Sequence, residues 1–526
     1  MEHDAIVIGS GFGGTLAAHE LVHAGWRVLM LERGPWVARG PGNWAPEAVG
    51  FLGPYYSTDT PYRVLARGER ETVGSFQCVG GQSVFYGGAS PRFRAEDFEP
   101  PPEIVGDSGA RWPFAYEDLE PHYTRAERII GVAGEAGPDP TEPFRSARYP
   151  QPPGALSPLA RRVWDAARSL GLHPFRLPLA LNHARRPGRA PCAACPNCDG
   201  FACAIGAKND LATAVLPGLL RRGLRLEAET VAVRLVARGR RLTGVECVER
   251  RTGRRVHHTA RVFVLAAGAL ASPHLVLASG LERLSPAGGA VGRYLTRHYN
   301  ALVMGVFPGR PDPEEEFHKQ VGIHDFYFGH PTIARPAGKL GAIQQRSTPP
   351  SALVKAQAPP LLRALAARAV PHVTGLMVIA EDQPQRENGV AIDSRRIDPY
   401  GLPQPLVTHR YSRRDVEAGG ALVARAREIL RRAGAWITYV HPMRSFSHAA
   451  GTLRMGTDPA SSALDPGGRF RGTENLYVAD ASVFPTSGGV NPSLTIAACA
   501  LRLGAHLAGV VPAAPAEPEI AQRRAS

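Results

Sequence analysis

Three glycines near the start of the chain, Gly9, Gly11 and Gly14, are spaced as G-x-G-x-x-G. In this spacing the first glycine makes a tight turn, the second lets backbone approach a pyrophosphate, and the third lets a helix pack closely on a strand. Glu32 follows about twenty residues later, where a carboxylate accepts hydrogen bonds from adenosine ribose hydroxyls. These residues predict a dinucleotide site, and Glu32 disfavours NADP because it would repel a 2′-phosphate.

A second group of reactive side chains is a cysteine segment with the spacing C-x₂-C-x₂-C-x₄-C, formed by Cys192, Cys195, Cys198 and Cys203. Soft, closely spaced thiolates suit zinc or an iron–sulfur cluster. The segment therefore predicts a metal site. The alternative is a loop held by one or two disulfides, or by nothing, although a reducing cytoplasm weighs against disulfides.

His448 stands at the start of a glycine-containing run, HAAGTLRMG, at 448–456. An imidazole has an unperturbed pKa near ~6.5, which suits a general base at neutral pH. On its own, however, His448 could be an ordinary loop histidine. Asn491 and Pro492 precede an apolar helical pattern, so Asn491 by itself is typical of a helix cap.

The elements that must position these residues follow an α/β pattern. Strand–helix patterns occupy 4–34, 224–280 and 475–507, with strands at Ala5–Ile8 and at NLYVAD (475–480), and a helix from Ser493 to about Leu507. We expect a Rossmann-like, doubly wound dinucleotide domain formed by 1–99, 186–299 and 441–510.

The remaining stretches, 100–185 and 300–440, are Pro-rich or strand-like. They predict an interleaved α+β substrate domain on a largely antiparallel sheet. Within them, 345–371 pairs prolines with an apolar, Arg-bearing helix that could cover the site entrance, touch a membrane surface or face solvent. Residues 511–526 predict a disordered tail.

Composition excludes some function classes. The net charge is 61 − 47 = +14, but the basic residues are almost all arginines scattered without blocks, which does not predict a nucleic-acid surface. No run reaches the ~18 apolar residues of a transmembrane helix. The chain opens directly into its first strand without a signal-peptide pattern, so we expect a cytoplasmic protein.

Taken together, several segments resemble the glucose–methanol–choline (GMC) flavoprotein oxidoreductases, in the family's order. They are DAIVIGSGFGGTLAAHEL (4–21), VGGQSVFYGGASPRF (79–93), WPFAYEDLEPHYTRAERIIGVAG (112–134), VFVLAAGALASPHLVLASG (262–280), HAAGTLRMG (448–456) and NLYVADASVFPTSGGVNPSLTIAA (475–498). The resemblance is nearest to cholesterol oxidases, long-chain alcohol oxidases and FAD-dependent sugar dehydrogenases.

The resemblance implies FAD and the oxidation of an alcohol to the carbonyl by hydride transfer to flavin N5. It places His448 over the flavin as general base and Asn491 as the group that orients the substrate oxygen. The matching positions imply that FAD contacts Gly9, Gly11, Phe12, Gly13, Gly14, Glu32, Arg33, Gly80, Gly81, Ser83, Tyr86, Gly87, Gly88, Val231, Ala267, Gly268, Asp480, Ala481, Asn491 and Pro492. In some relatives a His or Cys in the segment around 79–93 is tied to the flavin. Here no His lies in 73–99 and Cys78 precedes the glycine pair, so we expect non-covalent FAD.

The sequence leaves several alternatives open. The substrate can be an alcohol, a sterol or a sugar, and either O₂ or an external acceptor can reoxidise the flavin. Some GMC dehydrogenase subunits carry a cysteine-bound cluster in the region of Cys192–Cys203. Rival interpretations are an NAD-linked dehydrogenase, an FAD-bound GMC relative with lyase or photodecarboxylase chemistry, and a non-catalytic binding protein.

Overall fold

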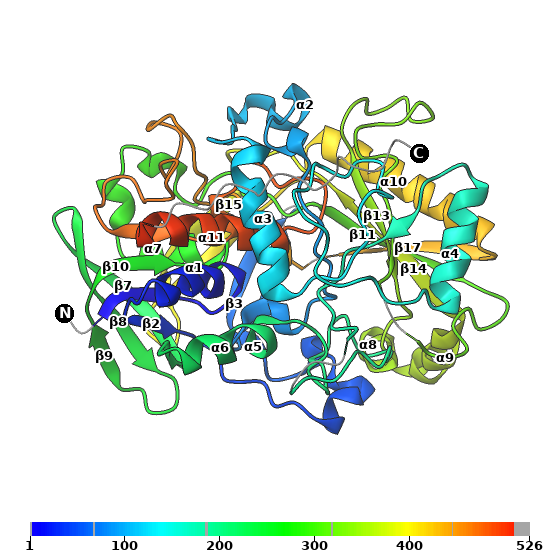
Figure 1. The fold of residues 1–526 in the computed structure, drawn as a ribbon, viewed down its shortest axis with the longest axis horizontal. Helices are drawn as coiled ribbons and strands as arrows, with labels where there is room; N and C mark the ends of the chain where they lie inside the picture. Colours follow the sequence, from blue (N-terminus) through cyan, green and yellow to red (C-terminus); the bar gives the residue numbers. More distant parts are fainter. Residues whose placement is uncertain (1–2, 67–68, 185–187, 317–318, 444, 510–526) are drawn as a thin grey trace, which may run out of the picture.

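The computed structural model describes residues 3–66, 69–184, 188–316, 319–443 and 445–509, and the tail predicted at 511–526 lies outside them. The side chains of 58–72 and of residue 442 are also outside the description. Two large sheets dominate the chain, one at each end of the long axis of the molecule (Figure 1).

The first sheet is parallel and has the strand order β18-β10-β1-β2-β6. Its strands are β1 (His3–Ile8), β2 (Val28–Leu31), β6 (Arg225–Glu227), β10 (Ala260–Leu265) and β18 (Leu476–Val478). Continuous apolar runs such as Val28–Leu31 suit a parallel sheet because both of its faces are covered. The strands come from each of the three stretches expected to form the dinucleotide domain.

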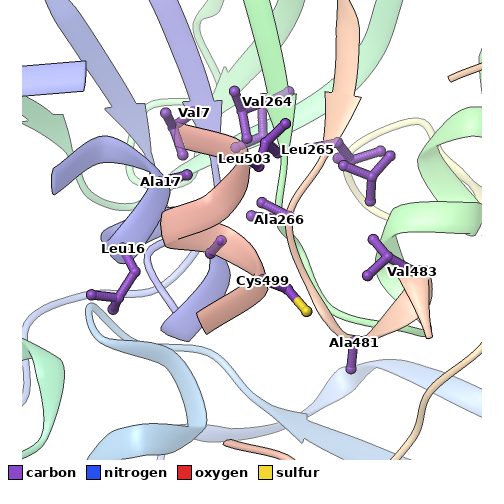
Figure 2. Close-up of a cluster of buried hydrophobic side chains, with 14 of the residues drawn as sticks. Val7, Leu16, Ala17, Val264, Leu265, Ala266, Ala481, Val483, Cys499 and Leu503 are labelled. Carbon is purple, nitrogen blue, oxygen red and sulfur yellow. The ribbon is translucent and has the colours of Figure 1, made fainter. Parts of the chain in front are cut away.

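Helices α1 (Phe12–His23) and α11 (Ser493–Ala508) pack against each other beside this sheet. A Cβ built on Gly504 would lie 2.8 Å from the carbonyl oxygen of Ala17, so the missing side chain permits this close approach. Figure 2 shows Leu503 of α11 near Val264 of β10, with Ala17 of α1 beside them. Helix α3 (Tyr116–Ile130) packs on the outer side of α11 and adds Tyr123 to the same core.

The second sheet has six strands in the order β17-β11-β14-β13-β12-β5, all antiparallel. Its strands are β5 (Phe175–Arg176), β11 (Tyr299–Val306), β12 (Val321–Ile323), β13 (Gly341–Arg346), β14 (Val373–Ala380) and β17 (Ile437–Pro442). Helices α10 (Arg413–Arg432) and α4 (Pro158–Ser169) pack with one face of this sheet, where Val303, Val378 and Leu422 share a core. Residues alternate between faces along a strand, so Gln344 and Met377, paired across β13 and β14, lie on the opposite face.

Two smaller sheets complete the strands. The first has the order β15-β16-β3-β4, and the second has the order β7-β8-β9. Their strands are β3 (Tyr56–Ala66), β4 (Glu69–Phe76), β7 (Thr230–Arg238), β8 (Arg241–Glu249), β9 (Arg255–His258), β15 (Gly389–Ile397) and β16 (Pro403–Thr408). Because β16 pairs with β3, the four-stranded sheet joins the stretch 1–99 to the stretch 300–440, and the expected domain boundaries stay a prediction.

The remaining helices are short: α2 (Pro102–Val105), α5 (Leu211–Ala214), α6 (Leu216–Arg221), α7 (Ala271–Ala278), α8 (Ser351–Gln357) and α9 (Arg363–Ala369). The last two fill 345–371 between β13 and β14, and α8 contacts the 3₁₀ turn Pro46–Ala48. Leu361 between them is 97% exposed, which leaves the expectations of a lid, a membrane contact or a solvent-facing connection untested. No helix in the described ranges is long and apolar enough to cross a membrane.

Candidate active site

A cavity of about 300 Å³ opens at the carboxyl ends of the strands of the parallel sheet. Ligands of open α/β sheets bind at this edge. Many of the residues expected to contact FAD line it: Gly9, Gly11, Phe12, Gly13, Glu32, Arg33, Gly81, Val231, Ala267, Gly268, Asp480, Ala481 and Pro492. The cavity therefore brings together segments that are up to about 480 residues apart in the chain, from Gly9 to Pro492.

The three fingerprint glycines are needed for different reasons. A Cβ on Gly9 would lie 2.3 Å from the carbonyl oxygen of Ala266, and one on Gly14 would lie 1.9 Å from the carbonyl oxygen of Gly9. These two positions therefore serve close packing of the turn and helix. A Cβ on Gly11 would meet no described atom within 4 Å, although Gly11 lines the cavity. The space at Gly11 is thus left for something other than protein, which fits a pyrophosphate at the N-terminus of α1.

Two buried carboxylates face the same cavity. Glu32 Oε2 accepts hydrogen bonds from Ser10 N at 3.1 Å and Ser10 Oγ at 2.6 Å, and Glu32 Oε1 accepts from Gly34 N at 2.8 Å. Asp480 accepts from Gly268 N at 2.8 Å and Ser482 N at 2.8 Å. Burial raises the pKa of both carboxyls, while these donors oppose that shift. Asp480 thus caps a turn and also borders the cavity.

Most of the segment 79–93 does not line the cavity; only its residues Gly81 and Gln82 do. Gly80 N donates to Ser10 Oγ at 2.9 Å, and Ser83 Oγ donates to the carbonyl oxygen of Gly80 at 2.6 Å. The Tyr86 ring meets the Phe12 ring edge-on, with centroids 5.5 Å apart. Of the described residues predicted to bind FAD, seven do not border the cavity: Gly14, Gly80, Ser83, Tyr86, Gly87, Gly88 and Asn491. Two of them, Gly80 and Tyr86, contact the cavity-lining residues Ser10 and Phe12.

His448 and Asn491 come together beside this cavity. Asn491 Nδ2 lies 3.4 Å from His448 Nε2. Ser447, Ala449 and Pro492, their chain neighbours, line the cavity. Neither His448 nor Asn491 lines the cavity itself, so the pair lies directly behind these lining residues.

Asn491 does not cap α11. Pro492 holds the N-cap position, and the cap has no side-chain hydrogen bond. Instead, Asn491 Oδ1 accepts a hydrogen bond from Gln344 Nε2 at 2.6 Å. The helix-cap interpretation of Asn491 is therefore wrong, because its amide is engaged by Gln344 on one side and faces His448 on the other.

The electrostatic surroundings keep His448 neutral. Its side chain is half-buried, and burial together with nearby His298 and Lys319 lowers the pKa of His448 well below the ordinary histidine value. A neutral imidazole can accept a proton, whereas an imidazolium cannot. The environment therefore favours the form that a general base requires.

The cysteine segment does not form the expected metal site. None of the cysteines in the described ranges forms a disulfide, and within these ranges no group of three or more His, Cys, Asp or Glu side chains is placed to hold a metal ion. The segment instead folds around the buried ammonium of Lys208, which donates to the carbonyl oxygens of Tyr86 at 2.9 Å, Cys198 at 2.9 Å and Phe201 at 2.6 Å. Burial raises the pKa of Cys192 to about 11 and that of Cys198 to about 12.

Two residues of the site escaped the sequence analysis. Gln344 holds Asn491, and His298 Nδ1 lies 3.0 Å from His448 Nδ1. Neither belongs to a local motif whose spacing indicates chemistry. The only sequence signal is that each lies on or beside a strand of the expected substrate sheet, where many side chains have no direct role.

The fold and the sequence together identify the class of protein. Residues 4–300 and 384–500 match the GMC oxidoreductase family. The chain therefore belongs to this family, and the resemblance noted in the sequence is confirmed. It is an enzyme of a family whose named members are oxidases and dehydrogenases that act on hydroxyl groups.

Among curated relatives, the 6'''-hydroxyparomomycin C oxidase of Streptomyces lividus is 34% identical, over 96% of this chain and 92% of that protein. The paromamine 6'-oxidase of Streptomyces fradiae is 32% identical, over 96% of this chain and 91% of that protein. Among solved structures, pyridoxine 4-oxidase from Mesorbium loti has a TM-score of 0.69 at 21% identity, covering 96% of this chain and 99% of that one. That structural likeness shows a shared fold.

Proposed function

We propose that this chain binds FAD non-covalently and oxidises an alcohol group of a sugar to the carbonyl, with His448 as general base. The observation that carries the proposal is the pair of His448 Nε2 and Asn491 Nδ2, which lie 3.4 Å apart and are next in the chain to residues that line the cavity. A binding protein has no need of a general base, and the match of residues 4–300 and 384–500 to the GMC oxidoreductases favours FAD over NAD.

The residues present suit FAD. Glu32 would hold the adenosine ribose, Gly11 and the N-terminus of α1 the pyrophosphate, and Asp480 the middle of the cofactor. When bound, FAD supplies the acceptor for the hydride that leaves the alcohol carbon. The start of α11, next to Pro492, adds a partial positive charge that favours negative charge nearby.

The chain's own part in the reaction is the handling of one proton. A neutral alcohol is a poor hydride donor, so the hydroxyl proton must leave as the hydride does. His448 Nε2 accepts that proton, which contributes roughly 10²–10⁴-fold to the rate. Asn491 Nδ2 donates a hydrogen bond to the same oxygen, because Asn491 Oδ1 is already engaged by Gln344.

Two observations support a sugar over a simple alcohol. The relatives at 34% and 32% identity are oxidases of hydroxyparomomycin C and paromamine. In addition, Gln344 is fully buried, and no described residue donates a hydrogen bond to its Oε1. A buried acceptor without a donor costs about 1–3 kcal/mol. Gln344 does not line the cavity, but it contacts Asn491, and we infer that a second substrate hydroxyl next to Asn491 supplies the missing donor. O₂ or an external acceptor completes the cycle.

The test is anaerobic bleaching of the protein-bound flavin by a panel of sugars and monofunctional alcohols, followed by admission of air. His448→Ala should keep FAD and slow the bleaching at least ~100-fold. A colourless protein, or bleaching by no alcohol, would reject the proposal. A near-normal rate in His448→Ala would reject the role of His448 alone. Reoxidation by air would distinguish an oxidase from a dehydrogenase.

A further inference from the structure

His298 links the candidate base to the loop that carries Asn491. Its Nδ1 lies 3.0 Å from His448 Nδ1, and its Nε2 lies 3.1 Å from the carbonyl oxygen of Ser487. The rings of His298 and His448 meet edge-on at 83°. Because His298 is fully buried, these contacts rather than bulk water decide where its protons reside.

The direction of each hydrogen bond follows from the chemistry of its acceptor. A carbonyl oxygen only accepts, so His298 Nε2 carries a proton and donates it to Ser487. A neutral imidazole has one protonated nitrogen, which leaves His298 Nδ1 as an acceptor. His448 Nδ1 must then carry a proton and donate it to His298. His448 Nε2 is consequently the unprotonated nitrogen, and it is the one that faces Asn491.

The backbone of His298 is held in an unusual conformation to make these contacts. Its φ of +61° lies in the left-handed region, which is costly for a residue with a Cβ. Asp382 stabilises this turn by accepting hydrogen bonds from the amides of Arg297 and His298, each at 2.9 Å. Tyr411 donates its hydroxyl to the carbonyl oxygen of His298 at 2.8 Å. A dedicated buried network thus maintains the strain.

The charged groups around His298 are engaged elsewhere. Asp382, besides the two amides, accepts from Ser487 Oγ at 3.2 Å and lies 3.3 Å from His409 Nε2. Both nitrogens of the His298 ring are occupied by His448 and Ser487, so the ring forms no hydrogen bond to a described carboxylate, although His298 contributes to lowering the pKa of Asp382. An imidazolium at His298 would also face His448 through Nδ1. The hydrogen-bond directions given above are those of a neutral His298 ring.

We propose that His298 is a positioning residue that fixes the Nδ1–H tautomer of His448 and so leaves Nε2 free to take the alcohol proton. The inference rests on the proposed function, because the tautomer matters only if His448 is the base. The inference gives a role in the reaction to His298, which lies about 150 positions before His448 in the chain. Without it, His448 can place its proton on Nε2, where it blocks proton transfer.

The experiment compares two variants of the FAD-loaded enzyme. His298→Leu removes the acceptor, whereas His298→Asn keeps an acceptor close to the position of Nδ1 and tolerates the left-handed backbone. His298→Leu should slow the limiting rate of anaerobic flavin bleaching at least ~10-fold, as loss of a tautomer-fixing partner does elsewhere. His298→Asn should restore most of that rate. The alcohol concentration at half-maximal rate should change little in either variant.

A direct readout is the ¹⁵N spectrum of protein labelled in its histidine rings, with the His448 signals assigned by their loss in His448→Gln. The wild-type should show a protonated Nδ1 and an unprotonated Nε2, and His298→Leu should mix the two tautomers. His122→Leu, which removes another buried histidine outside the site, is the control for general destabilisation. If His298→Leu fails to fold, the tautomer of His448 in the wild-type spectrum still tests the inference.

The outcomes separate the two proposals. Normal bleaching and an unchanged His448 tautomer in His298→Leu would overturn the inference. A wild-type His448 protonated on Nε2 would also overturn it. If neither the wild-type nor any variant is bleached by an alcohol, the proposed function fails and the inference fails with it.

Discussion

Asn491 Nδ2 and His448 Nε2 lie 3.4 Å apart, although 43 positions separate the two residues in the chain. Two long-range contacts create this geometry. Gln344 from the antiparallel sheet fixes the amide of Asn491, and His298 contacts the imidazole of His448. The candidate site thus depends on both large sheets.

The first prediction concerns Asn491→Ala. The variant loses a donor to the substrate oxygen, and we expect flavin reduction to slow at least ~10-fold. It should also lower the free energy of unfolding by about 1–3 kcal/mol, because Gln344 Nε2 loses its acceptor. Stopped-flow bleaching and thermal melting measure the two effects. A lower melting temperature with an unchanged bleaching rate would show that Asn491 is only structural.

A second prediction contrasts two glycines of one motif. Gly11→Ala puts a methyl group into space that the protein leaves open in the cavity, so FAD affinity should fall while the apoprotein keeps its stability. Gly14→Ala forces a Cβ against the carbonyl oxygen of Gly9 at 1.9 Å, so it should destabilise the fold itself. Melting of the apoproteins and FAD titration distinguish the two. Equal effects of both variants on stability would contradict this assignment of roles.

The third prediction tests the buried amide of Gln344. Gln344→Met should slow flavin bleaching by a sugar. Bleaching by the deoxy analogue, which lacks the hydroxyl next to the oxidised one, should slow by a factor at least ~10 times smaller. Gln345→Met is the matched control, because Gln345 lies on the opposite face of β13 and accepts from Gln320 N at 3.1 Å. Equal losses with both substrates would mean that Gln344 only holds Asn491.

The fourth prediction is a pH dependence. Because burial, His298 and Lys319 lower the pKa of His448, the base should stay neutral below the ordinary value of ~6.5. The limiting rate of flavin bleaching should therefore be flat from pH ~8 down through ~6.5 and decline only under more acidic conditions. In the unfolded chain His448 binds a proton near pH ~6.5, whereas in the folded protein it stays neutral at that pH. His448 therefore lowers the free energy of unfolding as the pH falls below ~6.5. A rate that halves near ~6.5 would contradict the lowered pKa.

Local patterns predicted the parallel sheet and the cavity-lining residues Gly9 and Gly11. The resemblance pointed to His448, Asn491 and the cavity-lining residues Gly13, Gly81 and Gly268. The strand at Ala5–Ile8 and the helix from Ser493 have clear periodicity and clear boundaries, and both are present as β1 and α11. Gln344 could not be predicted, because its role depends on which strand of a remote sheet reaches Asn491. That information lies in tertiary packing and leaves no spacing in the sequence.

The structure does not support the metal prediction for the cysteine segment, for a related reason. Thiol spacing indicates which residues are near each other in the chain, but ligation also requires thiolates and converging side chains. Here the buried ammonium of Lys208 occupies the centre of the loop and draws carbonyl oxygens toward it. Nothing in the pattern around the cysteines distinguished a lysine-centred loop from a metal-centred one.

The last prediction follows from that loop. Lys208→Met keeps most of the side-chain volume but leaves three buried carbonyl oxygens, those of Tyr86, Cys198 and Phe201, without this donor. We expect the free energy of unfolding to fall by about 3 kcal/mol or more. Lys355→Met, at an exposed lysine of α8, should change it by less than about 0.5 kcal/mol. Because Tyr86 packs against Phe12, the Lys208 variant should also bind FAD more weakly. Denaturant unfolding and FAD titration test both statements, and equal stability of the two lysine variants would show that Lys208 does not hold the loop.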